Sequence, residues 1–146
     1  MRIGLIDYGA GNLTSVIKAL SCCDADVRIV PSSASLRAVQ ALVIPGVGHF
    51  GRTSSLDRAW RRAIRSRIES GVPVLGICLG MHFLFEGSDE APGVAGLGVM
   101  KGRIARLAGD AEQRLKVPHV GWNALDFTRE ARLLQGLDSG AQVYFT

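Results

Sequence analysis

Short apolar runs alternate with amphipathic segments through residues 1–90, and this alternation restricts the possible fold more than any other feature. The runs predict strands, and segments 12–20 and 79–86 predict helices, the first capped by Asn12 or Thr14. The predicted strands cover residues 2–7, 27–30, 41–44 and 72–78, and residues 35–38 predict a short helical or turn segment. Nearly continuous apolar runs are typical of parallel strands covered on both faces. The pattern therefore predicts an α/β fold, a three-layer, doubly wound, mostly parallel sheet.

The length and composition favour one ordered domain spanning residues 1–146. Hydrophobic residues make up 47% of the chain and charged residues 21%, which is ordinary globular usage. The start reaches Asp7 and a glycine turn before any apolar stretch is long enough for a signal peptide or membrane span. We therefore expect a soluble, cytoplasmic protein that does not bind a membrane. The cysteines show no CxxC spacing, which gives no indication of a metal site or of a disulfide framework.

Arginines concentrate between Arg52 and Arg67, and the formal net charge is +4. Apolar side chains recur every four residues through the same stretch, at Leu56, Trp60, Ile64 and Ile68. This spacing is typical of an amphipathic surface helix, in which arginines 58, 61, 62 and 65 form a solvated face. No aromatic interleaving or nucleic-acid motif accompanies the charges, so we expect no nucleic-acid partner.

The chain changes character after about Ala91. Glycines become frequent, and the strand candidates 99–107 and 143–145 are joined by polar loops. Mixed or antiparallel pairing is plausible there.

The sharpest chemical signal is Gly76-Ile77-Cys78-Leu79-Gly80, where a predicted strand meets a predicted helix. This is the form of a nucleophile elbow with cysteine as the nucleophile. Small residues two before and two after the nucleophile prevent clashes in so tight a turn. The Leu79 N–H is then expected to be free, pointing into a helix N-terminus that favours a thiolate and a developing oxyanion. The alternative, that Cys78 is a small buried hydrophobic residue, does not explain the glycine spacing.

A glycine-rich loop, Pro45 to Gly51, follows the third predicted strand. Such loops also close ordinary turns, so position decides its meaning. In a doubly wound sheet, ligands gather at the carboxyl ends of the strands. We therefore expect this loop and Cys78 to face one site, where the loop could supply a second oxyanion donor.

Five blocks of the sequence resemble the triad-type (class I) glutamine amidotransferases. The blocks are residues 8–13, 45–51, 76–86, 90–94 and Lys116 to Asn123. The last block, with its Pro-His-Val-Gly-Trp-Asn run, is the most specific, and together with the second it is similar to the glutaminase subunit of imidazole glycerol phosphate synthase. The resemblance covers the whole chain and implies the flavodoxin-like fold of that family. It also implies hydrolysis of L-glutamine to glutamate and ammonia, without a cofactor, for a partner (β/α)₈-barrel cyclase in histidine biosynthesis.

The resemblance assigns roles to single residues. Cys78 would be the nucleophile that forms a γ-glutamyl thioester, and Val47 and Leu79 the backbone oxyanion donors. Gly48, His82 and Glu90 fall where the family contacts glutamine. A solvated surface glutamate is the alternative for Glu90. The residues that would face the cyclase are Asn12, Pro118, His119, Trp122 and Asn123.

Two departures from the family pattern bear on activity. His82 stands where the family usually has glutamine, and a histidine both donates and accepts hydrogen bonds only when it is neutral. The family's catalytic histidine and glutamate lie in a C-terminal segment beyond residue 146, so we expect a truncated chain that is inactive alone. His82 could substitute as the base, but an elbow nucleophile points away from its own helix. A non-catalytic paralogue that docks on the cyclase and a flavodoxin-like cysteine hydrolase with another substrate remain alternatives.

Overall fold

The computed structural model describes residues 1–108 and 117–145. Lys116, the first residue of the predicted block 116–123, lies outside them. The chain divides into two compact units, which are Met1–Arg106 and Leu107–Thr146. No helix among the described residues is both long and apolar enough to cross a membrane.

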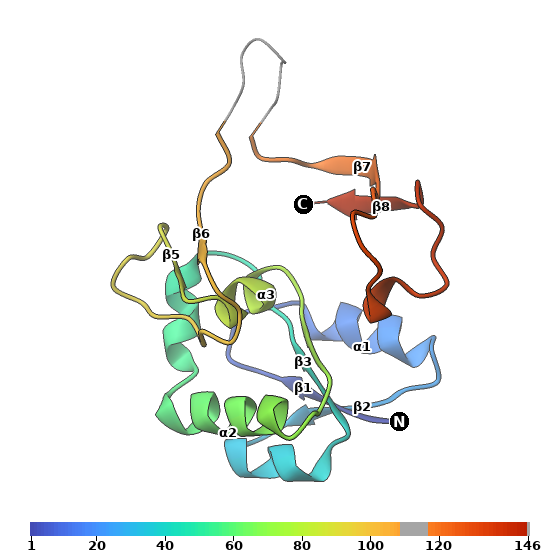
Figure 1. Cartoon of the computed structure of the whole chain (residues 1–146). Coiled ribbons are helices and arrows are strands. Elements are labelled where there is room, and N and C mark those ends of the chain that lie inside the picture. The colour runs from blue at the N-terminus through green and yellow to red at the C-terminus, as the bar shows by residue number, and fades with distance from the viewer. Residues whose placement is uncertain (109–116, 146) are drawn as a thin grey trace. The chain divides into compact units, whose positions relative to one another are not determined.

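A four-stranded parallel sheet forms the centre of the first unit (Figure 1). Its strands are β1 (Arg2–Ile6), β2 (Asp26–Val30), β3 (Ala41–Ile44) and β4 (Val74–Gly76), and their spatial order is β2-β1-β3-β4. The connection from β1 leads outward to β2, and the chain then crosses β1 to reach β3. This reversal of direction makes the β1/β3 boundary the switch point of a doubly wound sheet. The predicted α/β class is confirmed.

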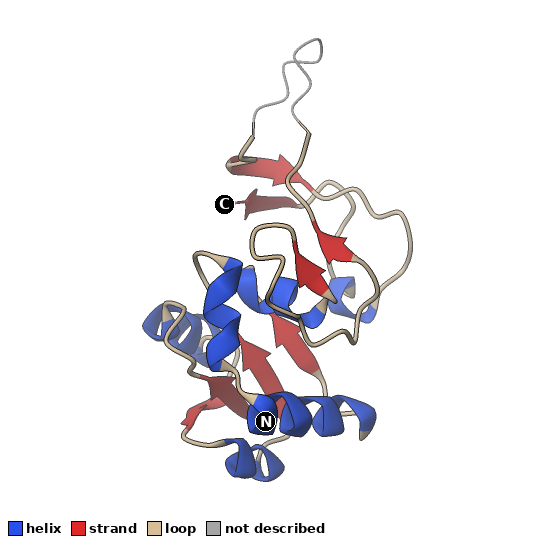
Figure 2. Cartoon of the chain, turned by 90° about the vertical axis from the view of Figure 1, so that its left-hand side faces the viewer, coloured by secondary structure: helices blue, strands red, loops and turns tan. Residues whose placement is uncertain are grey.

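Helix α1 (Leu13–Ser21) covers one face of the sheet (Figure 2). The Asn12 side chain caps it by accepting a hydrogen bond from the Ser15 N–H at 3.1 Å, which confirms one of the two predicted caps. The apolar side of α1 packs against the buried residues of this face, which are Ile3, Leu5, Ala41 and Val43. Alternate residues of β1 and β3 therefore point toward α1.

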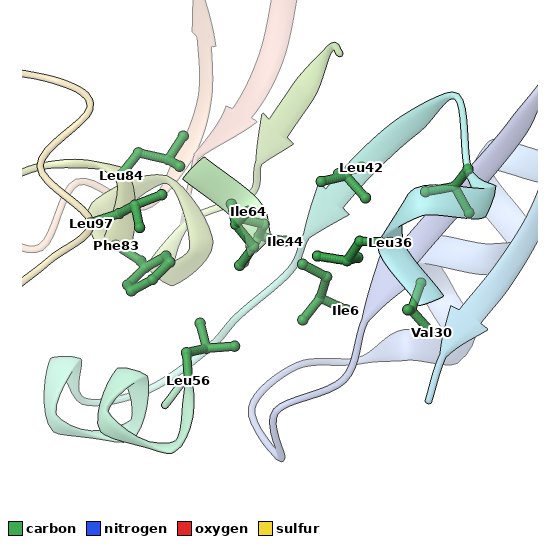
Figure 3. Packing of buried hydrophobic residues seen from close by; sticks show 11 residues of the cluster. Ile6, Val30, Leu36, Leu42, Ile44, Leu56, Ile64, Phe83, Leu84 and Leu97 are labelled. Carbon is green, nitrogen blue, oxygen red and sulfur yellow. The ribbon is translucent and has the colours of Figure 1, made fainter. Parts of the chain in front are cut away.

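The 3₁₀ segment η1 (Ser33–Ala38) and helix α2 (Arg58–Glu69) cover the opposite face. A larger apolar cluster fills this layer, and Figure 3 shows Ile6 and Ile44 from the sheet beside Leu36 of η1 and Ile64 of α2. Trp60 and Ile68 also pack against the cluster, as the four-residue spacing predicts.

The predicted solvated face is wrong for Arg61, which is half-buried, whereas Arg58, Arg62 and Arg65 are exposed. The Arg61 guanidinium donates to four backbone carbonyls, at 2.7 Å to Leu56, 2.9 Å to Ala95, 2.9 Å to Gly96 and 3.3 Å to Thr53. Arg65 donates to the Leu97 carbonyl. These hydrogen bonds hold α2 against the neighbouring loops. They also give the loop carbonyls beside the helix the donors that buried carbonyls require.

Several predicted elements are shorter in the structure. Strand β4 begins after Pro73, which has no N–H, and ends before Cys78, whose positive φ breaks extended geometry. Helix α3 covers only Leu79–Leu84 because Phe85 is extended. Of the predicted strand 99–107, only β6 (Arg103–Ile104) forms, in parallel with the unforeseen β5 (Gly87–Ser88).

The second unit contains an antiparallel pair, β7 (Gly121–Ala124) and β8 (Gln142–Phe145), and a 3₁₀ turn, η3 (Arg132–Leu134). The pairing confirms antiparallel structure in this half of the chain. The Trp122 and Tyr144 rings lie edge to face across the two strands at 5.6 Å. His119 stacks on Phe145 at 4.6 Å.

Candidate active site

The carboxyl ends of β1, β3 and β4 lie side by side, and the loops that leave them meet at one edge of the sheet. Tyr8 follows β1, the Pro45 to Gly51 loop follows β3, and Cys78 follows β4. Ala10, Phe50 and Leu79 from these three connections share one buried cluster. The predicted convergence of the glycine-rich loop and the elbow is therefore confirmed.

Cys78 has a backbone conformation that L-residues rarely adopt, with φ 50° and ψ −113°. Such a conformation costs about 1–3 kcal/mol and persists only where the surroundings enforce it. The Ile77 N–H donates to the Ile44 carbonyl at 2.9 Å and fixes the residue before it. The thiol is free and exposed. The turn therefore presents a nucleophilic side chain at the sheet edge.

Gly76 and Gly80 make this turn possible. A Cβ at Gly80 would lie 1.7 Å from the Ile44 carbonyl oxygen, and a Cβ at Gly76 would lie 2.5 Å from the Met81 Cα. Both obstacles are backbone atoms that cannot move aside cheaply. The predicted reason for the glycine spacing is confirmed.

The Leu79 amide is not free, contrary to the sequence prediction. It donates to the Gly46 carbonyl at 3.3 Å, which is long for an N–H···O bond. The sequence could not show this bond because it joins residues far apart along the chain. For Leu79 to hold an oxyanion, Gly46 must first release it.

The Pro45 to Gly51 loop is held from several sides. The His49 Nδ1 accepts from the Gly51 N–H at 3.0 Å, so this histidine has a role in loop structure. The Glu90 carboxylate accepts from the Phe50 N–H at 2.7 Å. Val47 and Gly48 are exposed at the tip, and Gly48 has φ 91°. The loop thus has a fixed base and an exposed tip.

Glu90 contacts the glycine-rich loop, and His82 lies on the helix that follows Cys78. Glu90 is exposed, but its carboxylate is bound to the loop, so it is not a purely solvated glutamate. His82 is half-buried on α3, and its backbone N–H donates to the Cys78 carbonyl at 2.9 Å. Among the hydrogen bonds of the described residues, none joins the Cys78 thiol to His49 or His82. A paired base for the thiol is therefore not seen in this part of the chain.

Tyr8 belongs to this site although sequence reasoning passed over its side chain. Its hydroxyl is buried and has no hydrogen-bond partner among the described residues. Burial, and secondarily the nearby Cys78, raise the pKa of Tyr8 to about 12. An aromatic residue directly after the first strand, at the edge that carries the elbow, was the available signal.

The residues assigned to a partner surface come from both units. Asn12 is exposed and caps α1. In the second unit, Trp122 is 72% exposed on β7, and Pro118, His119 and Asn123 are exposed beside it. The Asn123 amide lies 3.4 Å from the His119 Nε2. Three or more His, Cys, Asp or Glu side chains that could hold a metal ion are not found together in the described ranges.

The sequence matches the profile of the family described as "Glutamine amidotransferase class-I" over residues 4–146. The chain belongs to the class-I glutamine amidotransferase family. A solved structure described as "Crystal structure of glutamine amidotransferase" superposes with a TM-score of 0.62 at 22% identity, covering 71% of this chain and 56% of that one. At this identity the likeness supports the amidotransferase fold alone.

Curated relatives of this amidotransferase carry the name imidazole glycerol phosphate synthase subunit HisH. The protein from Deinococcus radiodurans is 42% identical over 143 residues, covering 97% of this chain and 66% of the relative. The one from Geobacillus thermodenitrificans is 45% identical over 148 residues, covering 98% and 68%. The one from Methanocaldococcus jannaschii is 40% identical over 143 residues, covering 98% and 70%. The amidotransferase chain thus spans about two thirds of the length of these relatives.

Proposed function

We propose that this chain is the glutaminase part of an imidazole glycerol phosphate synthase, which releases ammonia from L-glutamine for a cyclase partner. The relatives named above support the assignment to this synthase. The observation that carries the chemistry is the strained, exposed Cys78 between two glycines that admit no Cβ. Strain of this kind is typical of residues that take part in a reaction.

In the proposed reaction, the Cys78 thiolate attacks the γ-carboxamide carbon of glutamine. A C–S bond forms, and the carbonyl electron pair moves onto oxygen. The Val47 and Leu79 N–H groups would hold that oxyanion once Gly46 has released Leu79. Collapse of the intermediate breaks the C–N bond, and the nitrogen leaves as ammonia after taking up a proton. Water then cleaves the thioester to glutamate and restores the thiol.

Substrate contacts are proposed for Gly48, His82 and Glu90. Gly48 lies at the exposed loop tip, where a backbone can approach a ligand closely. The Glu90 carboxylate accepts one hydrogen bond from Phe50, and its remaining lone pairs could accept from the α-ammonium of glutamine. His82 would contact the amide in its neutral form.

The partner is proposed to be a (β/α)₈-barrel cyclase that receives the ammonia, in a cytoplasmic heterodimer with synthase (lyase) activity. The exposed aromatic pair of the second unit, Trp122 and Tyr144, supports a docking surface because large exposed aromatic side chains are common anchors of interfaces. Asn12, Pro118, His119 and Asn123 complete the proposed contact residues.

Ammonia and glutamate formation from L-glutamine, with and without a cyclase of the synthase, tests this function. We expect this chain alone to release negligible ammonia. A version extended by a C-terminal segment with the family's histidine and glutamate should release both products in equal amounts, and Cys78→Ala should abolish that release. Cyclase binding without glutamine hydrolysis would instead support a non-catalytic docking chain. Hydrolysis of other amides or esters by Cys78, but never of glutamine, would support a different cysteine hydrolase.

A further inference from the structure

Tyr8 carries a buried hydrogen-bond donor that the proposed reaction does not yet use. Its hydroxyl has no partner among the described residues. With a pKa near 12, the phenol keeps its proton at physiological pH. Buried polar groups are nearly always paired, so an unpaired one in a reactive site needs an explanation, and an acceptor that reaches it in another state of the protein supplies one.

This hydroxyl lies beside Gly46, whose carbonyl occupies the Leu79 amide. A Cβ built on Gly46 would lie 2.1 Å from the Tyr8 hydroxyl oxygen, 2.8 Å from the Leu79 Cβ and 3.1 Å from the Gly80 nitrogen. The hydroxyl, Gly46 and the first turn of α3 therefore meet at one point. The Gly46 carbonyl at this point accepts the long hydrogen bond from Leu79.

Gly46 is buried, and Leu79 is the one donor that the described residues give its carbonyl, so release of Leu79 removes that donor. A buried carbonyl that loses its only donor is costly, so the rearrangement needs a replacement. The Tyr8 O–H is a free donor beside the same residue.

We propose that Tyr8 is a positioning residue whose O–H takes over the Gly46 carbonyl when that carbonyl leaves the Leu79 N–H. This inference rests on the proposed function, because the freed amide matters only when an oxyanion forms on acylation of Cys78. Tyr8 touches neither substrate nor the reacting atoms in this scheme. It acts through Gly46 and Leu79.

Two reactions of the same thiol test the inference. A γ-glutamyl nitrophenyl ester acylates Cys78 through an oxyanion: the C–S bond forms, and nitrophenolate leaves with the electron pair of the broken C–O bond. Iodoacetamide alkylates Cys78 by displacement of iodide and forms no oxyanion. Both rates are measured in a Cys22→Ser, Cys23→Ser background, where Cys78 is the single thiol of the chain.

We expect Tyr8→Phe to slow acylation about tenfold, the effect of one hydrogen bond made only in the reactive state. Alkylation should change less than about twofold, since only the oxyanion step depends on Leu79. The free energy of unfolding should not fall, because the hydroxyl has no partner in the described state. Ser66→Ala, which removes an exposed hydroxyl from α2, is the control and should leave both rates unchanged.

Equal acylation rates in Tyr8→Phe and the parent chain would overturn the inference while leaving the proposed function intact. Parallel losses of acylation, alkylation and stability would also overturn it, because they indicate that the hydroxyl is a structural group. If the parent chain reacts with the ester no faster than its Cys78→Ala variant does, the proposed function is ruled out. The proposed role of Tyr8 is then ruled out as well.

Discussion

Cys78 occupies a conformation that most L-residues avoid, and the surrounding fold must supply the energy to hold it there. Its φ of 50° places the Cβ against its own backbone. The glycines on either side let the neighbouring backbone close around this turn. Reactivity and stability therefore oppose each other at this residue.

Substitution of Cys78 can separate these two effects. Cys78→Gly removes the Cβ and should raise the free energy of unfolding by about 1 kcal/mol, because relief of strain exceeds the added entropy of the unfolded chain. Cys78→Ala keeps the Cβ and should bring no such gain. Urea denaturation of both variants checks this, and a stabilised Cys78→Ala with an unchanged Cys78→Gly would contradict it.

A substitution at Gly80 tests whether α3 must lie this close to β3. The Cβ of Gly80→Ala would collide with the Ile44 carbonyl at 1.7 Å, so we expect a loss of about 3 kcal/mol or more of unfolding free energy. Gly93→Ala is the matched control, because a Cβ there meets nothing within 4 Å. Thermal denaturation of the pair should show a lower melting temperature for Gly80→Ala alone. Similar melting temperatures would show that α3 can shift away from β3.

The Tyr8 phenol should also make stability depend on pH. Burial raises its folded pKa from 10.0 to about 12, so the unfolded chain loses this proton first. The corresponding stability is present below pH 10 and is lost as pH rises toward 12. Urea denaturation between pH 9 and about 11.5 should show a steeper decline for the parent chain than for Tyr8→Phe. Identical slopes would indicate an ordinary, solvated phenol.

At the scale of elements, arginine side chains join α2 to the loops that border the site. Arg61 donates to carbonyls of two separate segments and lies 5.0 Å from the Phe83 ring centroid. Phe83 belongs to α3, which follows Cys78. Arg61 therefore connects the outer helix with the element that positions the nucleophile.

Replacement of Arg61 should be costly, whereas replacement of its neighbour should not. Arg61→Met leaves several backbone carbonyls without their donor, and we expect a loss of about 2 kcal/mol of unfolding free energy. Arg62 is exposed on the same helix, and Arg62→Met should change this value by less than about 0.5 kcal/mol. Chemical denaturation measures both. Equal, small effects would mean that water replaces the Arg61 contacts.

The elements that the sequence predicts best are those whose signals are local. The apolar runs locate β1 and β3 closely, and Asn12 marks the start of α1. The arginine contacts and the short β5–β6 pair escaped prediction because they depend on which backbone carbonyls lie near each other in space. A three-residue β4 ends early because Cys78 turns the chain, and local apolarity carries no sign of that turn.

On the scale of the whole molecule, the parts of the site also differ in whether local sequence or long-range contacts determine them. The glycine spacing around Cys78 predicts the elbow because the constraint lies within five residues. The occupied Leu79 amide and the hydrogen bond from Phe50 to Glu90 join distant segments, so only the folded chain reveals them. The family resemblance predicts which residues belong to the site. It does not predict the hydrogen bonds that those residues make.

Trp122 offers a test of the proposed assembly, because its ring is 72% exposed and contacts Tyr144 across the strand pair. A core tryptophan would be needed for folding, whereas an exposed one is free to bind a partner. We expect Trp122→Ala to weaken binding to the cyclase about 30-fold, equivalent to about 2 kcal/mol. The unfolding free energy should change by less than about 1 kcal/mol, the scale of a cross-strand pair.

Leu133→Ala is the matched control for docking, since Leu133 is 75% exposed in the same unit but lies in η3, outside the β7–β8 pair. Calorimetric titration of each variant with the cyclase gives the dissociation constants, and circular dichroism reports whether each variant still folds. Loss of affinity confined to Trp122→Ala would support docking through this strand pair. Full affinity in Trp122→Ala, or equal losses in both variants, would show that the cyclase binds a different surface or senses only exposed apolar area in general.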